Sequence, residues 1–225
     1  MHSDWDADWE LVVFDCDGVL VDSERLTVTL EARLLTELGW PMSESEVVQR
    51  WMGRAAAAQL TEVGDRLGAA TAEQFDRRLT TELERAFATE LRPVAGIPRL
   101  LDHLTELGVA SCVASSGTPA RMALTLGATG LLSRFEGRIF SAVEVEHGKP
   151  APDLFLLAAE RMGVAPERCV VVEDSVPGVR AAVEAGMHVF GYARGLANAE
   201  DLRTAGAEVF DDMTVLARRL GAPCR

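Results

Sequence analysis

Three short, mostly apolar runs, each followed directly by polar residues, constrain the fold of this chain most strongly. They are Leu11–Phe14, Val109–Ala114 and Cys169–Val172. A strand that is apolar along its length, without alternation, is typical of a parallel sheet covered on both faces. Weaker runs of the same kind predict further strands at 138–140, 187–192 and 208–210.

Helical patterns separate these strands from residue 93 onward. Apolar residues recur at helical spacing in the segments Ile97–Leu107, Pro119–Leu126, Pro152–Met162, Val176–Ala185 and Met213–Leu220. Strands that alternate with helices indicate βαβ units, whose crossover helices cover both faces of a parallel sheet. The sequence therefore predicts an α/β fold with a Rossmann-like parallel sheet core.

The segment 23–92 interrupts this alternation, because it contains only helical patterns. They lie at 25–38, 45–51, 55–67 and 72–91. An all-helical block inserted after the first strand of an α/β domain is typical of a cap. We therefore expect an α/β core formed by 1–22 and 93–225, and an inserted all-α cap domain at 23–92. Pro and Gly in the segment 92–96 are consistent with a domain boundary.

The formal net charge of −13 restricts the partners of the chain. Such a surface repels the phosphates of nucleic acids, so we expect no nucleic-acid partner. A site for a small anion would have to be locally positive. The chain contains one lysine, Lys149, and its other long cationic side chains are all arginine. That single lysine is therefore a candidate for a chemical role.

The sequence also lacks features of membrane and secreted proteins. No apolar run approaches the ~18 residues that a membrane span needs. The acidic segment 1–10 lacks the basic start and apolar stretch of a secretory signal. We expect a cytoplasmic protein without a membrane partner, as a monomer or weak homodimer.

Polar residues follow the three clearest strands at the point where each strand ends. They are Asp15, Asp17, Ser115, Glu173 and Asp174. In open α/β sheets, ligands bind outside the carboxyl ends of the strands. Lys149 lies in the loop 148–153, whose two prolines mark the start of the next helix. We therefore expect four separate segments to converge on one edge of the sheet.

These residue types together indicate phosphoryl transfer. Clustered carboxylates raise one another's pKa unless a cation lies among them, and Mg²⁺ prefers carboxylate and backbone oxygens. With its charge balanced, Asp15 could attack a phosphoryl group, while Lys149 and the Ser115 hydroxyl hold the phosphoryl oxygens. Asp17 could protonate the leaving oxygen and then take a proton from the attacking water.

Four motifs of the chain resemble those of the haloacid dehalogenase-like superfamily. The segment 15–24, Asp-Cys-Asp-Gly-Val-Leu-Val-Asp-Ser-Glu, is similar to the first motif of its phosphatases and mutases that have a small helical cap. Ser115, Lys149 and the segment 173–182 resemble the second, third and fourth motifs. The motifs occur in the order of the family and span most of the chain, which makes the resemblance specific.

The resemblance implies a role for each motif residue. Asp15 would be the nucleophile and a ligand of Mg²⁺, and Asp17 would be the acid/base, with its backbone carbonyl on the metal. Asp174 would bind the metal, and Glu173 would bind it directly or through water. Ser115 and Lys149 would hold the phosphoryl group. We further expect Ser116 to contact the substrate, and Arg54 of the cap to reach its distal end.

Local alternatives exist for some of these residues. Ser115 could cap the helix that begins at Thr118 or Pro119, and Asp174 could cap the helix that follows it. Trp40 and Trp51 are expected to form part of the cap core rather than a substrate platform.

Several activities occur among proteins that resemble this chain. Asp17 argues against a dehalogenase, and the lack of lysine in 23–92 argues against phosphonate cleavage through a Schiff base. A hexose-phosphate mutase would be expected to have an arginine at the position of Ala56. We therefore favour a Mg²⁺-dependent phosphohydrolase that acts on a small phosphorylated metabolite, such as a sugar or polyol phosphate. The mutase and a non-catalytic binding module on the same fold remain alternatives.

Overall fold

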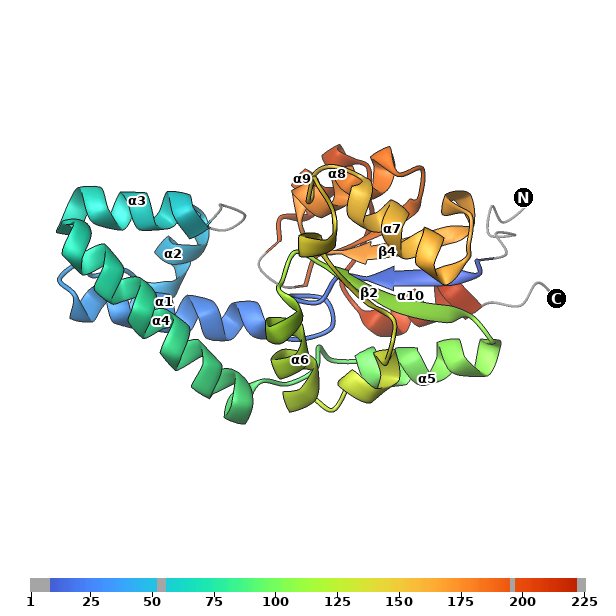
Figure 1. Ribbon diagram of the computed structural model, residues 1–225, viewed down its shortest axis with the longest axis horizontal. Helices are drawn as coiled ribbons and strands as arrows, with labels where there is room; N and C mark the ends of the chain where they lie inside the picture. Colours follow the sequence, from blue (N-terminus) through green and yellow to red (C-terminus); the bar gives the residue numbers. More distant parts are fainter. Residues whose placement is uncertain (1–8, 52–55, 195–196, 222–225) are drawn as a thin grey trace. The chain divides into compact units, whose positions relative to one another are not determined.

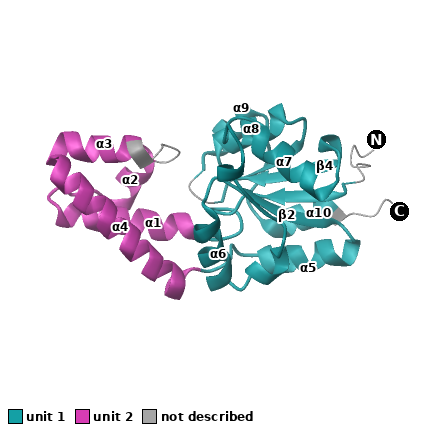
Figure 2. Cartoon of the chain, viewed as in Figure 1, with its two compact units in different colours: residues 1–22, 92–225 teal, residues 23–91 magenta. Residues whose placement is uncertain are grey.

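The computed structural model describes residues 9–51, 56–194 and 197–221. The chain divides into two compact units, one formed by 1–22 and 92–225 and the other by 23–91 (Figure 2). The expected cap segment ended at 92, one residue later. Arg92 belongs to the first unit, where its carbonyl oxygen accepts a hydrogen bond of 3.0 Å from the backbone N–H of Asp22.

The first unit is built on a six-stranded sheet in which all neighbouring strands are parallel. The spatial order is β3-β2-β1-β4-β5-β6. In chain order the strands are β1 (Leu11–Phe14), β2 (Ala110–Ser115), β3 (Ile139–Ser141), β4 (Cys169–Glu173), β5 (His188–Tyr192) and β6 (Glu208–Phe210). The six strands predicted from the apolar runs are all present, with shifts of one residue at some ends.

The central strands owe their position to their composition. Every residue of β1 and β4 is buried, as continuous apolar runs require between two helical layers. Phe14, the last residue of β1, lies opposite Val113 of β2 and Val172 of β4. The polar residues that follow these strands therefore emerge at the same edge of the sheet.

Helices cover both faces of the sheet (Figure 1). One layer contains α5 (Ile97–Leu107), α6 (Pro119–Ala128) and α10 (Met213–Gly221), and the other contains α7 (Asp153–Met162), α8 (Val176–Glu184) and α9 (Ala199–Ala205). Short 3₁₀ segments lie at Leu132–Phe135, Ala142–Glu144 and Pro166–Arg168. In the described part of the chain, no helix combines the length and the hydropathy that a membrane crossing requires.

Among its described residues, the second unit contains helices and the loops that join them, without a strand. The helices are α1 (Ser23–Glu37), α2 (Glu44–Trp51), α3 (Ala56–Leu67) and α4 (Ala69–Glu90). Trp51 is 1% exposed and lies edge-on to Trp40 and Phe75, with ring centroids 5.9 and 6.1 Å apart. Trp51 thus belongs to the core of this unit.

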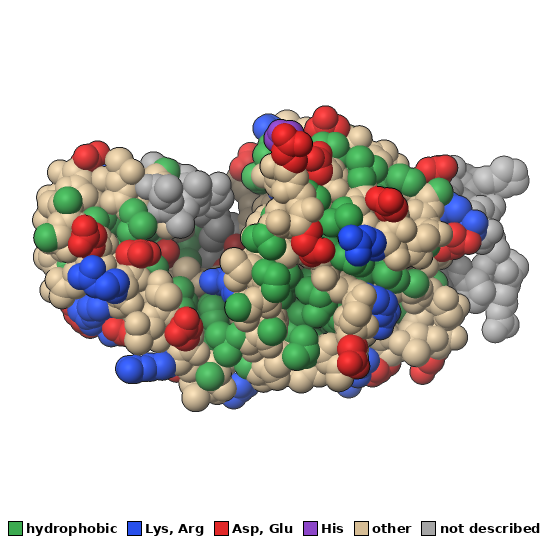
Figure 3. Space-filling model, viewed as in Figure 1, with side chains coloured by type: hydrophobic (Ala, Val, Ile, Leu, Met, Phe, Trp, Pro, Cys, Tyr) green, Lys and Arg blue, Asp and Glu red, His purple; other side chains and the backbone are tan. Residues whose placement is uncertain are grey.

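Acidic and basic side chains are interspersed on the face of the molecule seen in Figure 3.

Candidate active site

The loop after β1 positions the first two aspartates. The backbone N–H of Asp15 donates to the carbonyl oxygen of Val172 at 3.0 Å, so Asp15 continues the hydrogen bonding of β1 beyond the end of the strand. The chain then turns back, and the N–H of Gly18 donates to the carbonyl of Val21 at 2.9 Å. Gly18 has φ 78°, a conformation that glycine adopts without steric cost. The first aspartate is therefore held by the sheet and the second by a tight turn.

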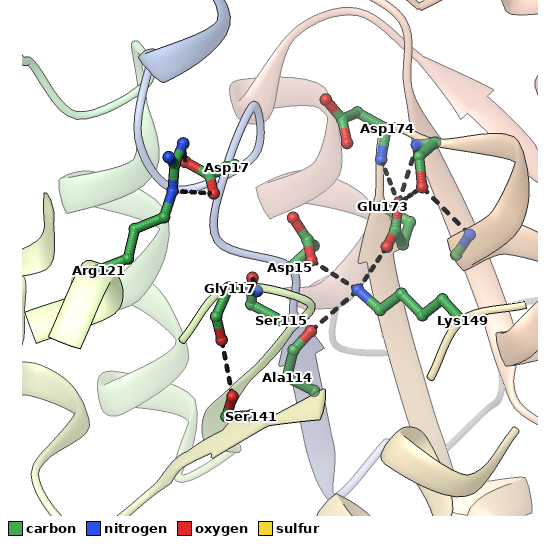
Figure 4. A network of polar contacts seen from close by, with 12 residues as sticks. Asp15, Asp17, Ala114, Ser115, Gly117, Arg121, Ser141, Lys149, Glu173 and Asp174 are labelled. Atoms are coloured by element: carbon green, nitrogen blue, oxygen red, sulfur yellow. Dashed lines mark hydrogen bonds and ion pairs between the residues drawn. The ribbon is translucent and has the colours of Figure 1, made fainter. Parts of the chain in front are cut away.

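Asp15, Lys149 and Glu173 form an ion-pair cluster at this edge (Figure 4). Lys149 Nζ lies 2.5 Å from Asp15 Oδ1 and 2.7 Å from Glu173 Oε1, and it also donates to the carbonyl oxygen of Ala114 at 3.0 Å. The lysine side chain is only 4% exposed. One ammonium group thus joins the ends of β1, β2 and β4.

The electrostatics of the cluster follow from its burial. Burial raises the pKa of Asp15 to about 7, against the opposing effect of Lys149 and with an added contribution from Glu173. Burial alone would lower the pKa of Lys149, but the two carboxylates outweigh it and raise this pKa above its ordinary value. Lys149 and its two carboxylate neighbours therefore stabilise one another's charge, while burial acts in the opposite direction on Asp15 and raises its pKa.

Glu173 is fixed by donors of the two residues between β4 and α8. Its Oε2 accepts from the backbone N–H groups of Asp174 and Ser175, at 2.9 and 2.8 Å, and from the Ser175 hydroxyl at 2.9 Å. Three donors saturate this oxygen, and Oε1 is the one that faces Lys149. A Cβ atom at Gly178 would overlap the Glu173 carboxylate. The helix can pass this close only because that position is glycine.

Two helix caps differ from the alternatives that the sequence allowed. The N-cap of α8 is Ser175, whose hydroxyl accepts from the N–H of Gly178 at 3.1 Å, and not Asp174. The N-cap of α6 is Thr118, whose hydroxyl accepts from the N–H of Arg121, and not Ser115. Both caps have the ordinary N-cap pattern of a side-chain oxygen bonded to an amide of the first turn. Ser115 and Asp174 are therefore not used as helix caps.

The Ser115 loop lies at the end of β2. Ser115 is buried, and its hydroxyl accepts from the backbone N–H of Gly117 at 3.2 Å. The Ser141 hydroxyl at the end of β3 donates to the Gly117 carbonyl at 2.7 Å, which ties this loop to the neighbouring strand. Ser116, the next residue, is exposed.

Asp17 does not join the ion-pair cluster. Its carboxylate is turned toward Arg121 and away from Asp15 (Figure 4). Arg121 donates to it from Nε, at 3.1 Å to Oδ2, and from Nη2, at 3.2 Å to Oδ1. Arg121 is not among the site residues predicted from the sequence. Its only signal is its place in the first turn of the helix that follows the Ser115 loop.

The donor set fits a magnesium ion by type. Among the described residues, no three His, Cys, Asp or Glu side chains gather closely enough to hold a metal by themselves. Mg²⁺ needs fewer, because it is commonly bound by one or two carboxylates together with waters and phosphate oxygens. Asp15 and Asp174 follow adjacent strands, and the unbalanced burial of Asp15 favours an added cation. Arg54 lies outside the described residues, as does the side chain of Ala56.

Comparison with known proteins places the chain in a family. The family model for haloacid dehalogenase-like hydrolases matches residues 9–186. A 6-phosphogluconate phosphatase of Escherichia coli is 33% identical over 80% of this chain and 81% of its own. A phosphorylated carbohydrates phosphatase of Thermotoga maritima is 34% identical over 88% of this chain and 92% of its own. These relatives are phosphatases, and the chain shares their enzyme class, phosphoric monoester hydrolase.

A solved structure agrees with this assignment. A hydrolase of the same family from Deinococcus radiodurans, solved with bound phosphate and sodium, has a TM-score of 0.84 to this chain. It is 30% identical and covers 96% of each chain. The motifs, the sheet order, the family model and these relatives agree. The chain belongs to the haloacid dehalogenase-like hydrolase family.

Proposed function

We propose that this chain is a Mg²⁺-dependent phosphohydrolase that cleaves a small phosphorylated metabolite through a phosphoryl group carried transiently on Asp15. The observation that carries the proposal is the buried contact of Asp15 with Lys149, at 2.5 Å. A cation beside a desolvated carboxylate lets that carboxylate approach an anionic phosphoryl group. The names of the two phosphatase relatives support a sugar or polyol phosphate as the substrate class.

In the first step, Asp15 is the nucleophile. One of its carboxylate oxygens forms a bond to phosphorus, and the bond between phosphorus and the ester oxygen breaks. Lys149 and the hydroxyl of Ser115 hold the phosphoryl oxygens while their charge is redistributed. Asp17 gives a proton to the departing ester oxygen, which leaves as the alcohol of the metabolite.

In the second step, water releases the phosphoryl group. Asp17, now a carboxylate, takes a proton from the water, whose oxygen bonds to phosphorus. The bond between phosphorus and Asp15 breaks, so that inorganic phosphate leaves and the Asp15 carboxylate is restored. Each proton that Asp17 gives in the first step is recovered in the second.

Mg²⁺ would be held by the carboxylates of Asp15 and Asp174 and the backbone carbonyl of Asp17, with Glu173 bound directly or through water. When bound, the ion supplies positive charge that neutralises the phosphoryl oxygens. Residues 23–91 form a separate helical unit, and we propose that residues of this unit contribute to the choice of metabolite.

Phosphate release from a panel of sugar and polyol phosphates tests this function. We expect Mg²⁺-dependent release, its loss on chelation with EDTA and its return when Mg²⁺ is added. Asp15→Asn should lower kcat by about 1,000-fold or more, because Asp15 is the group that takes the phosphoryl group in the proposed first step. Asp102→Asn is the matched control, since Asp102 pairs with Arg134 away from the site.

The same panel separates the alternatives. Full activity after thorough chelation would refute the metal assignment. Isomerised sugar phosphate without free phosphate would identify a mutase, and no turnover of any ester by the unmodified chain would favour a binding module. Mass spectrometry of acid-quenched protein should find the phosphoryl group on the peptide that contains Asp15.

A further inference from the structure

The pairing of Asp17 with Arg121 conflicts with the role proposed for Asp17. Both carboxylate oxygens accept hydrogen bonds from one guanidinium group, at 3.1 and 3.2 Å. A carboxylate bound in this bidentate way carries no proton to donate and is directed at the arginine. Before Asp17 can protonate a leaving oxygen or accept a proton from water, at least one of these bonds has to break.

Arg121 reaches Asp17 from the helix that follows the Ser115 loop. Its backbone N–H is fixed by the Thr118 cap at the start of α6. Its side chain runs past the Ser115 loop: a Cβ atom built on Gly117 would lie 3.5 Å from Ser115 Oγ and 3.7 Å from Arg121 Cδ. The aliphatic part of the Arg121 side chain therefore lies near the Ser115 loop, and its guanidinium group extends from there to Asp17.

We propose that Arg121 is a positioning residue that holds Asp17 turned away from Asp15 in the substrate-free enzyme, and that a bound substrate displaces this pairing. The inference rests on the proposed acid/base role of Asp17. A two-state equilibrium follows, in which Asp17 is either paired with Arg121 or directed at the ester oxygen. A substrate shifts this equilibrium only by the factor by which it binds the second state more tightly than the first.

The pairing is weak enough to be displaced. The side chains of Arg121 and Asp17 are 38% and 29% exposed, so solvent screens their attraction. Ion pairs that are exposed to this extent change equilibria by no more than about five-fold. The paired state thus lowers the fraction of enzyme with a competent Asp17 without abolishing activity.

The leaving group of the substrate isolates this effect. p-Nitrophenolate is a stable anion and departs without a proton, whereas the alkoxide of a polyol phosphate needs one from Asp17. The value of kcat/KM covers the reaction up to transfer of the phosphoryl group to Asp15. The ratio of kcat/KM for glycerol phosphate to kcat/KM for p-nitrophenyl phosphate therefore reports how well Asp17 protonates the leaving oxygen. Any general effect of losing the positive charge of Arg121 changes kcat/KM for both substrates and therefore cancels in this ratio.

We expect Arg121→Ala to raise this ratio by about two- to five-fold, because Asp17 is released from its partner. Arg121→Lys should return the ratio toward that of the unmodified enzyme, since an ammonium group can still pair with Asp17. An unchanged ratio would reduce Arg121 to a structural role, and a lower ratio would mean that it holds Asp17 in the productive position. Either result overturns the proposal. Arg121→Gln, which keeps most of the side chain, replaces the alanine variant if that variant unfolds.

Asp17→Asn separates failure of this inference from failure of the proposed function. This variant should lower the ratio sharply, and Arg121→Ala added to it should then have no effect on the ratio. If Asp17→Asn leaves the ratio unchanged, the acid/base role itself is refuted. If Asp17→Asn lowers the ratio but Arg121→Ala does not raise it, only the positioning role of Arg121 fails.

Discussion

Three carboxyl groups of the candidate site have different surroundings. Asp15 is next to the ammonium group of Lys149, Asp17 is bound by Arg121, and Glu173 accepts from Lys149 and from donors just before α8. A chain of net charge −13 can gather these groups because each one has its own local donors. Glu173, with three donors on one oxygen, supports Lys149, whereas the Asp15 carboxylate accepts only from the ammonium group among the hydrogen bonds described above.

Glu31 of α1 provides a contrasting case at the residue scale. It is 5% exposed, and burial raises its pKa from an ordinary 4.5 to about 7. The folded state therefore binds the proton more tightly than the unfolded state. The stability that this provides is complete below about pH 4.5 and is lost as the pH rises through 7.

Glu31→Gln should consequently stabilise the protein at pH 8 and have little effect at pH 4.5. The gain at pH 8 should be on the order of 2 kcal/mol, because the amide stays neutral where the carboxylate is forced to ionise. Urea unfolding at the two pH values measures it. Glu73→Gln, at a side chain that is 73% exposed, is the control. Equal effects of Glu31→Gln at both pH values would contradict the expectation.

At the scale of elements, the N-cap of α8 has two functions. Ser175 caps the helix through Gly178, and the same hydroxyl donates to Glu173. The cap of α9, Asn198, accepts from the N–H of Glu200 at 2.9 Å and lies on an exposed segment. The two caps are therefore comparable for helix stability but differ in their link to the site.

Ser175→Ala and Asn198→Ala should each lower the free energy of unfolding by about 1 kcal/mol, the usual cost of a lost N-cap. Only Ser175→Ala should also reduce kcat/KM, by about ten-fold, because Glu173 then loses a donor and holds Lys149 less firmly. Chemical denaturation and steady-state kinetics on both variants test this. A similar loss of activity in both would show that helix stability, and not the contact with Glu173, is responsible.

At the scale of the whole molecule, the two units have separate cores. Phe75 is 1% exposed within 23–91, and Phe190 is fully buried within the sheet unit. Chains with separate cores need not unfold in one step.

Phe75→Ala and Phe190→Ala should each cost about 3–5 kcal/mol, and each should lower a different thermal transition. Calorimetry should resolve the two transitions. With Trp5 and Trp9 replaced by Phe, the fluorescence of Trp40 and Trp51 should follow the transition that Phe75→Ala lowers, since both lie in the second unit. If both variants shift a single common transition by the same amount, the units unfold together and the expectation is wrong.

Short-range patterns in the sequence were sufficient to predict most of the architecture. Burial of a continuous apolar run depends on its own residues, so the strands and the longer helices were identified from composition and spacing. The helix α9 was missed because its seven residues include one buried side chain, Leu202. Asn198, a favoured N-cap residue, was the local signal for it.

The pairing of charged side chains depended on the tertiary structure. The sequence predicted that the ends of β1, β2 and β4 and the Lys149 loop meet at one edge of the sheet. It could not predict that Arg121, 104 residues from Asp17, binds that aspartate, or that Glu173 supports Lys149. Burial of an apolar run is decided within a few residues of the chain. The choice of partner for a charge is decided by which distant groups the fold brings within hydrogen-bond distance.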